Sequence, residues 1–184
     1  ISPRGAKHEP PRRLRLTERR TNLFPAHLGH ELVIALLEWN HESIKPTSNW
    51  RRLNMEYRTL GRTGVRVSSL CCGTMSFGAE ADAQEAGRIY AACRERGVNF
   101  FDTTNSYNGG ESERILGCLI REERDAIVLS SKIFNKMGKD LNAQGGNRRN
   151  IALAVDASLK RLGTDRIDVL FMHRWDSVTP LEET

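Results

Sequence analysis

The chain has 184 residues, 39% of them hydrophobic, which suits one globular domain with a real core and leaves room for a tail. The formal net charge of +5 belongs to the front of the sequence. Residues 1–54 carry ten Lys and Arg but only five Asp and Glu, whereas residues 55–184 carry 18 of each. A neutral domain gives no electrostatic reason to expect nucleic acid as a partner.

Cysteine usage and hydropathy exclude several further classes. The four cysteines, Cys71, Cys72, Cys93 and Cys118, have no C-x-x-C spacing and no nearby pair of histidines. We expect reduced, buried thiols rather than a disulfide or a metal site. The longest largely apolar run, Leu32–Trp39, is too short to cross a bilayer, and no signal-peptide pattern opens the chain. The sequence therefore predicts a cytoplasmic location without membrane insertion.

Residues 1–54 differ in composition from everything that follows. They hold five of the six prolines and four of the five histidines, and the first methionine is Met55, where the composition changes. We interpret residues 1–54 as a basic, disordered or non-native extension, and residues 55–184 as the folded unit. An arginine-rich transit peptide is the weaker interpretation, because the segment has five acidic residues and little serine.

From Met55 onward the hydrophobic patterns alternate between strand and helix. Residues 56–70 predict a hairpin around Gly61 and Gly64, because glycine readily adopts the positive φ that tight turns need. The pattern then predicts strands at 70–75, 98–104, 126–132 and 167–173, separated by helices at 81–96, 111–122 and 147–163. Gly97 and Gly163 are placed to end the first and last of these helices.

Strands without a polar face, separated by helices, indicate a parallel α/β sheet with right-handed crossovers. Two folds meet this description, a doubly wound sheet and a (β/α)8 TIM barrel. The stretch CCGTMSFG after the first parallel strand lacks the G-x-G-x-x-G fingerprint, which favours the barrel. Because a complete barrel needs roughly 250 residues, we expect only its N-terminal half, the hairpin with about four βα-type strands.

Polar residues gather at the predicted carboxyl ends of three strands. Asp102 ends one strand and Tyr107 lies in the loop after it, while Lys132 and His173 end the next two. Ligands of parallel α/β folds bind at this edge, so we expect the four side chains to converge. A free tyrosine has a pKa near 10, which a neighbouring ammonium group would lower. A carboxylate would hold the lysine, and a histidine could orient a carbonyl oxygen. The set predicts carbonyl reduction with a nicotinamide cofactor and no metal.

Several stretches resemble the aldo-keto reductase superfamily, particularly its branch of bacterial general-stress-type reductases and potassium-channel β subunits. They are YRTLGRTGVRVSSLCCGTMSFG, NFFDTTNSYNGGESERILG, VLSSK, NRRNIALAVDASLKRLGTDRIDVLFMHRWD and TPLEET, in the family's order and spacing. The resemblance implies an eight-stranded barrel closed beneath by the hairpin, and NADPH binding without a Rossmann fold.

The resemblance also assigns roles to individual residues. It makes Tyr107 the general acid, Lys132 the group that tunes its pKa, and His173 a guide for the substrate carbonyl. Asp102 anchors the lysine and touches the nicotinamide ribose. The turn Gly73, Thr74 and Met75 corresponds to the segment that lies against the cofactor. For Trp175, a pocket wall and a packing role are equally compatible with the sequence.

The function implied is NADPH-dependent reduction of a small aldehyde or ketone. In the family most cofactor contacts come from the second half of the barrel, so we expect a fragment that is inactive alone unless a second copy or the missing half completes it. Whether the protein forms a homo-oligomer is therefore left open. Two alternatives remain: a cofactor-binding regulatory subunit of the potassium-channel β type, and a non-functional truncated product. Substrate identity is not predicted.

Overall fold

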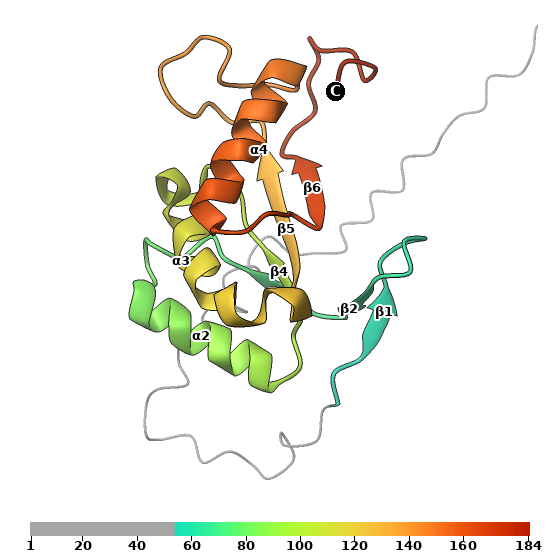
Figure 1. Ribbon diagram of the computed structural model, residues 1–184, viewed down its shortest axis with the longest axis vertical. Coiled ribbons are helices and arrows are strands. Elements are labelled where there is room, and N and C mark those ends of the chain that lie inside the picture. The colour runs from blue at the N-terminus through green and yellow to red at the C-terminus, as the bar shows by residue number, and fades with distance from the viewer. Residues whose placement is uncertain (1–53) are drawn as a thin grey trace, which may run out of the picture. The chain divides into compact units, whose positions relative to one another are not determined.

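The structure is a computed structural model that describes residues 54–184 of the chain (Figure 1). The expected extension at residues 1–54 lies outside the described residues, apart from Asn54, and its boundary stays a prediction. The described elements follow the expected order, a hairpin and then strands that alternate with helices.

The hairpin pairs β1 (Tyr57–Thr59) antiparallel with β2 (Arg66–Ser68). Its turn needs the positive φ angles of Gly61 and Gly64, which are 54° and 80°. The Asn99 side chain accepts a hydrogen bond from Ser68 N at 2.7 Å and donates to the Arg66 carbonyl at 3.0 Å. The hairpin is thus attached to the residue that precedes the second parallel strand.

Four parallel strands form one sheet in the order β3-β4-β5-β6. Their bounds are Cys72–Gly73, Phe100–Asp102, Val128–Ile133 and Val169–Met172. Between them run α2 (Ala83–Glu95), α3 (Glu111–Ile120) and α4 (Arg148–Leu162), with 3₁₀ turns at Tyr107–Gly110 and Arg121–Ala126. The three helices stack on one face of the sheet (Figure 1), as in a (β/α) barrel and unlike a doubly wound sheet. The expected α/β class and partial barrel are confirmed.

The core lies between this sheet and its helices. Phe101 of β4 and Leu129 of β5 are fully buried, and they pack with Leu116 of α3 and Tyr90 of α2. Burying each large apolar side chain contributes about 1.5–3 kcal/mol. Gly117 allows α3 to cross α4 closely, because a Cβ there would lie 2.2 Å from the Leu162 carbonyl oxygen.

An ion pair is buried in the same layer. The Glu113 side chain on α3 is fully buried, accepts a hydrogen bond from Arg161 Nε of α4 at 2.7 Å and another from Ser131 Oγ of β5 at 2.7 Å. Both carboxylate oxygens are therefore paired, which offsets the cost of burying the charge. This contact joins two helices and one strand.

The cysteines depart in part from expectation. None is in a disulfide and Cys93 is buried, but Cys71 and Cys118 are exposed, so the prediction that all four are buried is wrong. Cys71 precedes β3 by one residue. Strand alternation turns it, like Gly73, away from the helices, and both residues line an open cavity described below.

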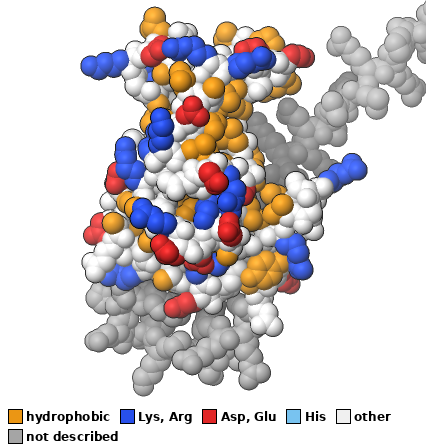
Figure 2. Space-filling view, viewed as in Figure 1, with side chains coloured by type: hydrophobic (Ala, Val, Ile, Leu, Met, Phe, Trp, Pro, Cys, Tyr) orange, Lys and Arg blue, Asp and Glu red, His pale blue; other side chains and the backbone are white. Residues whose placement is uncertain are grey.

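Apolar side chains are also exposed on β6, which pairs only with β5 within residues 54–184. Leu170 and Phe171 are about half exposed, and so is Leu153 on α4. Figure 2 shows hydrophobic side chains gathered in the region of β6, and charges of both signs elsewhere on the face that it presents.

Among the described helices, none is long and apolar enough to span a bilayer.

Candidate active site

Strand register brings the predicted polar residues to one face of the sheet. Asp102 pairs with Ser130, and Lys132, two residues further along β5, pairs with Phe171 of β6. Side chains alternate along a strand, so these residues point away from the helices while their neighbours Phe101, Leu129 and Ile133 are buried beneath them. The face without helices therefore carries the site.

Asp102 and Lys132 form an ion pair across β4 and β5. Lys132 Nζ donates to Asp102 Oδ2 and also to the Thr103 carbonyl at 3.0 Å. Ser130 Oγ donates to the second carboxylate oxygen, Oδ1, at 2.6 Å. Their side chains are only 19% and 24% exposed, so each charge compensates the other's partial burial. Two groups at the end of β4 therefore hold the lysine directly, and Ser130 holds the carboxylate that pairs with it.

Tyr107 begins the 3₁₀ turn that follows β4. Lys132 Nζ lies 5.4 Å from the centre of its ring. The next residue, Asn108, has a φ of 50° and donates to the carbonyls of Met75 and Phe77 at 3.0 and 2.8 Å. Asn108 thereby holds the tyrosine loop against the turn after β3. Within residues 54–184, the phenol hydroxyl has no hydrogen-bond partner and is available to a ligand.

His173 follows β6 directly and completes the cluster. Its ring meets the Tyr107 ring edge-on, with the ring centres 6.3 Å apart. Its Nδ1 lies 3.3 Å from Thr104 Oγ1 and 3.4 Å from Asn135 Nδ2. Burial, and then the positive charges of Lys132 and Arg174, lower the pKa of His173, with Asp102 acting in the opposite direction. The imidazole is therefore neutral at neutral pH.

The turn Gly73, Thr74 and Met75 lies beside this cluster. Thr74 is fully buried, and its hydroxyl hydrogen-bonds the Asp102 carbonyl at 3.1 Å and Ser112 Oγ at 2.7 Å. Thr74 thus supports the site and presents no surface to a ligand. Met75 is 67% exposed, and a Cβ on Gly73 would meet no atom within 4 Å. Within this turn, the accessible groups are Gly73 and Met75.

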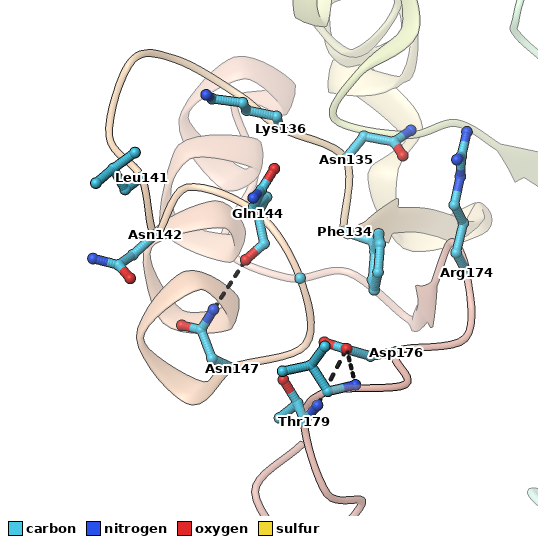
Figure 3. A pocket seen from close by; sticks show the side chains of 12 residues that line it. Phe134, Asn135, Lys136, Leu141, Asn142, Gln144, Asn147, Arg174, Asp176 and Thr179 are labelled. Carbon is cyan, nitrogen blue, oxygen red and sulfur yellow. Dashed lines mark hydrogen bonds between the residues drawn. The ribbon is translucent and has the colours of Figure 1, made fainter.

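Two cavities adjoin these residues. One, of about 580 Å³, lies on the face without helices and is lined by Cys71, Gly73, Phe100, Asp102, Ser130, Lys132, Phe171, Met172 and His173. The other, of about 550 Å³, lies between the loop after β5 and the segment after β6 (Figure 3). Asn135 and Arg174 lie on the same side of this second cavity. Asn135 therefore both lines the second cavity and contacts the His173 ring.

Three contributors were not predicted from the sequence: Ser130, Thr104 and Asn135. Ser130 could have been found, because it lies two residues before Lys132 on a strand and must share its face. Trp175, for which two roles were open, is 74% exposed and lines neither cavity. Among residues 54–184 no group of three or more His, Cys, Asp or Glu side chains could hold a metal.

A parallel sheet covered by helices on one face, with ionisable side chains clustered at the carboxyl ends of its strands, defines part of a (β/α) barrel. The chain belongs to the Aldo/keto reductase family, whose model matches residues 69–184.

Individual relatives agree with this membership. A probable voltage-gated potassium channel subunit beta of Arabidopsis thaliana is 46% identical over 134 residues, which are 71% of this chain and 40% of that protein. The norsolorinic acid reductase of Aspergillus flavus is 42% identical over 135 residues, 65% of this chain and 35% of that one. The chain spans about two fifths of the length of such relatives.

A solved structure is also similar. The holo form of the aldo-keto reductase AKR11C1 from Bacillus halodurans superposes with a TM-score of 0.64 at 34% sequence identity. The match covers 70% of this chain and 43% of that one. The partial barrel described above is therefore an aldo/keto reductase fold.

Proposed function

We propose that this protein is a cytoplasmic carbonyl reductase that uses NADPH to reduce small aldehydes or ketones, with Tyr107 as the proton donor. One observation carries the proposal: the Lys132 ammonium group, compensated by Asp102, lies 5.4 Å from the Tyr107 ring. A phenol beside a fixed ammonium group is suited to giving up its proton, because the positive charge stabilises the phenolate that is left.

The residues around the larger cavity fit a nicotinamide cofactor. Gly73 leaves open space where a side chain would otherwise stand, and Met75 is exposed beside it. Asp102 lines the same cavity and could accept a hydrogen bond from a ribose hydroxyl. Bound there, the cofactor would supply a hydride to the carbonyl carbon. We therefore assign Gly73, Met75 and Asp102 to its binding, with Thr74 as their support.

The remaining chemistry belongs to the chain's own side chains. Tyr107 donates its phenol proton to the carbonyl oxygen as the carbon takes up the hydride that a bound dinucleotide would supply, so that an alcohol forms. Lys132 stabilises the resulting phenolate, which regains a proton from solvent. Neutral His173 hydrogen-bonds the carbonyl oxygen and orients it. Ser130 and Asp102 keep the lysine in place through the contacts described above.

The test is NADPH consumption with 4-nitrobenzaldehyde by the full-length protein, because we expect this chain to be inactive without a second copy or the missing half of the barrel. Tyr107→Phe should reduce the rate by roughly 100-fold or more, the contribution typical of a positioned acid, while NADPH binding, followed by cofactor fluorescence, is retained. Tyr57→Phe is the matched control, because it removes a phenol hydroxyl of the hairpin, which donates to the Gly97 carbonyl after α2. Equal rates for wild type and Tyr107→Phe would refute the general-acid role.

A second candidate function is suggested by the similarity to a potassium channel subunit beta. Under this alternative the same site binds the cofactor, but its occupancy regulates a protein partner. Cofactor binding without turnover of several aldehydes and ketones would favour regulation. Multiple turnovers that depend on Tyr107 would favour the reductase.

A further inference from the structure

The Nδ1 side of His173 has two neighbours that require different protonation states. Thr104 Oγ1 lies 3.3 Å away and Asn135 Nδ2 lies 3.4 Å away. His173 is the one imidazole among residues 54–184, and within this part of the chain its other ring nitrogen, Nε2, has no hydrogen-bond partner. A neutral imidazole carries one N–H proton. A partner that determines whether Nδ1 is protonated therefore also determines whether Nε2 is a hydrogen-bond donor or an acceptor.

Thr104 can serve only as an acceptor toward the ring. Its hydroxyl has one proton, which is donated to the Lys132 carbonyl at 2.8 Å. A hydrogen bond between Thr104 and His173 would therefore need the imidazole proton on Nδ1. Nε2 would then be a bare acceptor, and a bare nitrogen repels the oxygen of a carbonyl group.

Asn135 has the opposite requirement. Its amide nitrogen carries two protons and accepts none. One proton is directed at Ser106 Oγ, 3.0 Å away in the loop after β4, and the other at His173 Nδ1. A hydrogen bond from Asn135 therefore needs an unprotonated Nδ1, which places the imidazole proton on Nε2.

We propose that Asn135 is a positioning residue that fixes the tautomer of His173. Its amide, held by Ser106, donates to Nδ1, and neutral His173 keeps its proton on Nε2, where it can hydrogen-bond a substrate carbonyl. The assignment of the N–H to a substrate rests on the proposed function, whereas the tautomer itself does not. Asn135 acts through His173 and is not itself a catalytic residue.

The tautomer can be measured directly by NMR on the full chain labelled with nitrogen-15 histidine. A long-range proton–nitrogen correlation spectrum separates protonated from bare ring nitrogens, and the His173 signals are those that vanish in His173→Gln. At a pH where the ring is neutral, we expect Nε2 protonated and Nδ1 bare in the wild type. A wild-type spectrum with Nδ1 protonated overturns the proposal, whatever the variants do.

Matched variants test the role of the amide. Asn135→Leu leaves Thr104 as the Nδ1 neighbour, so the major tautomer should switch to Nδ1–H. Asn135→Asp should do the same, because a carboxylate can only accept. Thr104→Val should keep Nε2–H, and so should Asn142→Leu, the control from an exposed part of the same loop, whose backbone and side chain both hydrogen-bond Asp140 and not His173. An unchanged tautomer in both Asn135 variants refutes the inference.

Kinetics separate this inference from the proposed function. If the wild type reduces 4-nitrobenzaldehyde, Asn135→Leu should lower kcat roughly 10-fold with little change in NADPH affinity, in keeping with a lost orienting contact. If the full-length wild type reduces nothing, the reductase proposal fails, and the spectrum still decides the tautomer.

Discussion

Lys132 and Asp102 meet across the two central strands of the sheet, with Ser130 holding the second oxygen of the carboxylate. The three residues come from two parallel strands whose register puts Asp102 beside Ser130. The ammonium group is thereby fixed at the strand ends, next to Tyr107. Backbone pairing, more than loop conformation, sets the centre of the site.

Because the pair is mostly buried, losing both partners should cost less than the summed costs of losing each alone. We expect Asp102→Asn or Lys132→Met alone to lower the free energy of unfolding by about 1–3 kcal/mol, since each leaves a mostly buried charge or acceptor unpaired. The double variant should lose less than the sum of the two. Urea unfolding of the four proteins measures this coupling. Strictly additive losses would show that the two charges do not stabilise each other.

The histidine should make stability depend on pH. Burial, Lys132 and Arg174 hold the pKa of His173 below the ordinary value of 6.5, so the unfolded chain binds this proton at a higher pH than the folded chain. The contribution of neutral His173 is complete above about pH 6.5 and is lost as the pH falls through the lower folded-state pKa.

Unfolding free energies of wild type and His173→Gln, compared between about pH 8 and 5, isolate this contribution because the other histidines are common to both. The stability of the wild type relative to the variant should decline with falling pH. In an Arg174→Gln background the decline should be smaller, since one charge that lowers the pKa of His173 is gone. If the difference in unfolding free energy between wild type and His173→Gln stayed constant from about pH 8 to 5, the pKa of His173 would not be lowered by folding.

The strands were predictable because each is a short apolar run, but their lengths were not. Residues 70–75 read as one strand, whereas only Cys72 and Gly73 pair in the sheet. Thr74 instead turns inward, with its hydroxyl bonded to the Asp102 carbonyl. A local pattern reports burial, and burial alone does not distinguish a strand residue from a buried turn residue.

The site was predictable where strand ends define it. Asp102, Lys132 and His173 each end an apolar run, so parallel pairing must bring them to one edge. Asn135 could not be found in this way. Its position depends on the path of the loop after β5, where Phe134 has a φ of 146°, and no local sequence signal predicts that conformation. Their proposed roles in catalysis stay predictions.

The crossing of α3 and α4 gives a sharp stability test. In Gly117→Ala the new methyl would overlap the Leu162 carbonyl, which lies 2.2 Å from the Cβ position. We expect a loss of about 3 kcal/mol or more, at the upper end for overpacking. Gly87→Ala on α2 is the control, because its Cβ would be 3.7 Å from Leu119 Cδ2, an ordinary contact. Better helix propensity should make that variant about 0.5–1 kcal/mol more stable. Thermal unfolding of both distinguishes steric overlap from a general intolerance of helix substitutions.

The Glu113 and Arg161 pair should behave as a buried charge that needs its partner. Arg161→Met leaves a fully buried carboxylate without its cation, and we expect a loss of about 3–5 kcal/mol. Adding Glu113→Leu to Arg161→Met removes the unpaired charge and should restore most of the lost free energy of unfolding. About 1 kcal/mol should remain lost, because the Ser131 hydroxyl no longer has its acceptor.

The same helix supplies an exposed pair for comparison, Arg114 with Glu111, whose side chains are 53% and 46% exposed. Arg114→Met should cost less than about 0.5 kcal/mol, because water already solvates both charges. Both variants should be unfolded with urea, because guanidinium chloride is a salt and would screen the charge interactions that distinguish the buried pair from the exposed one. If Arg161→Met cost no more than Arg114→Met, the buried ion pair would not be what joins α3 to α4.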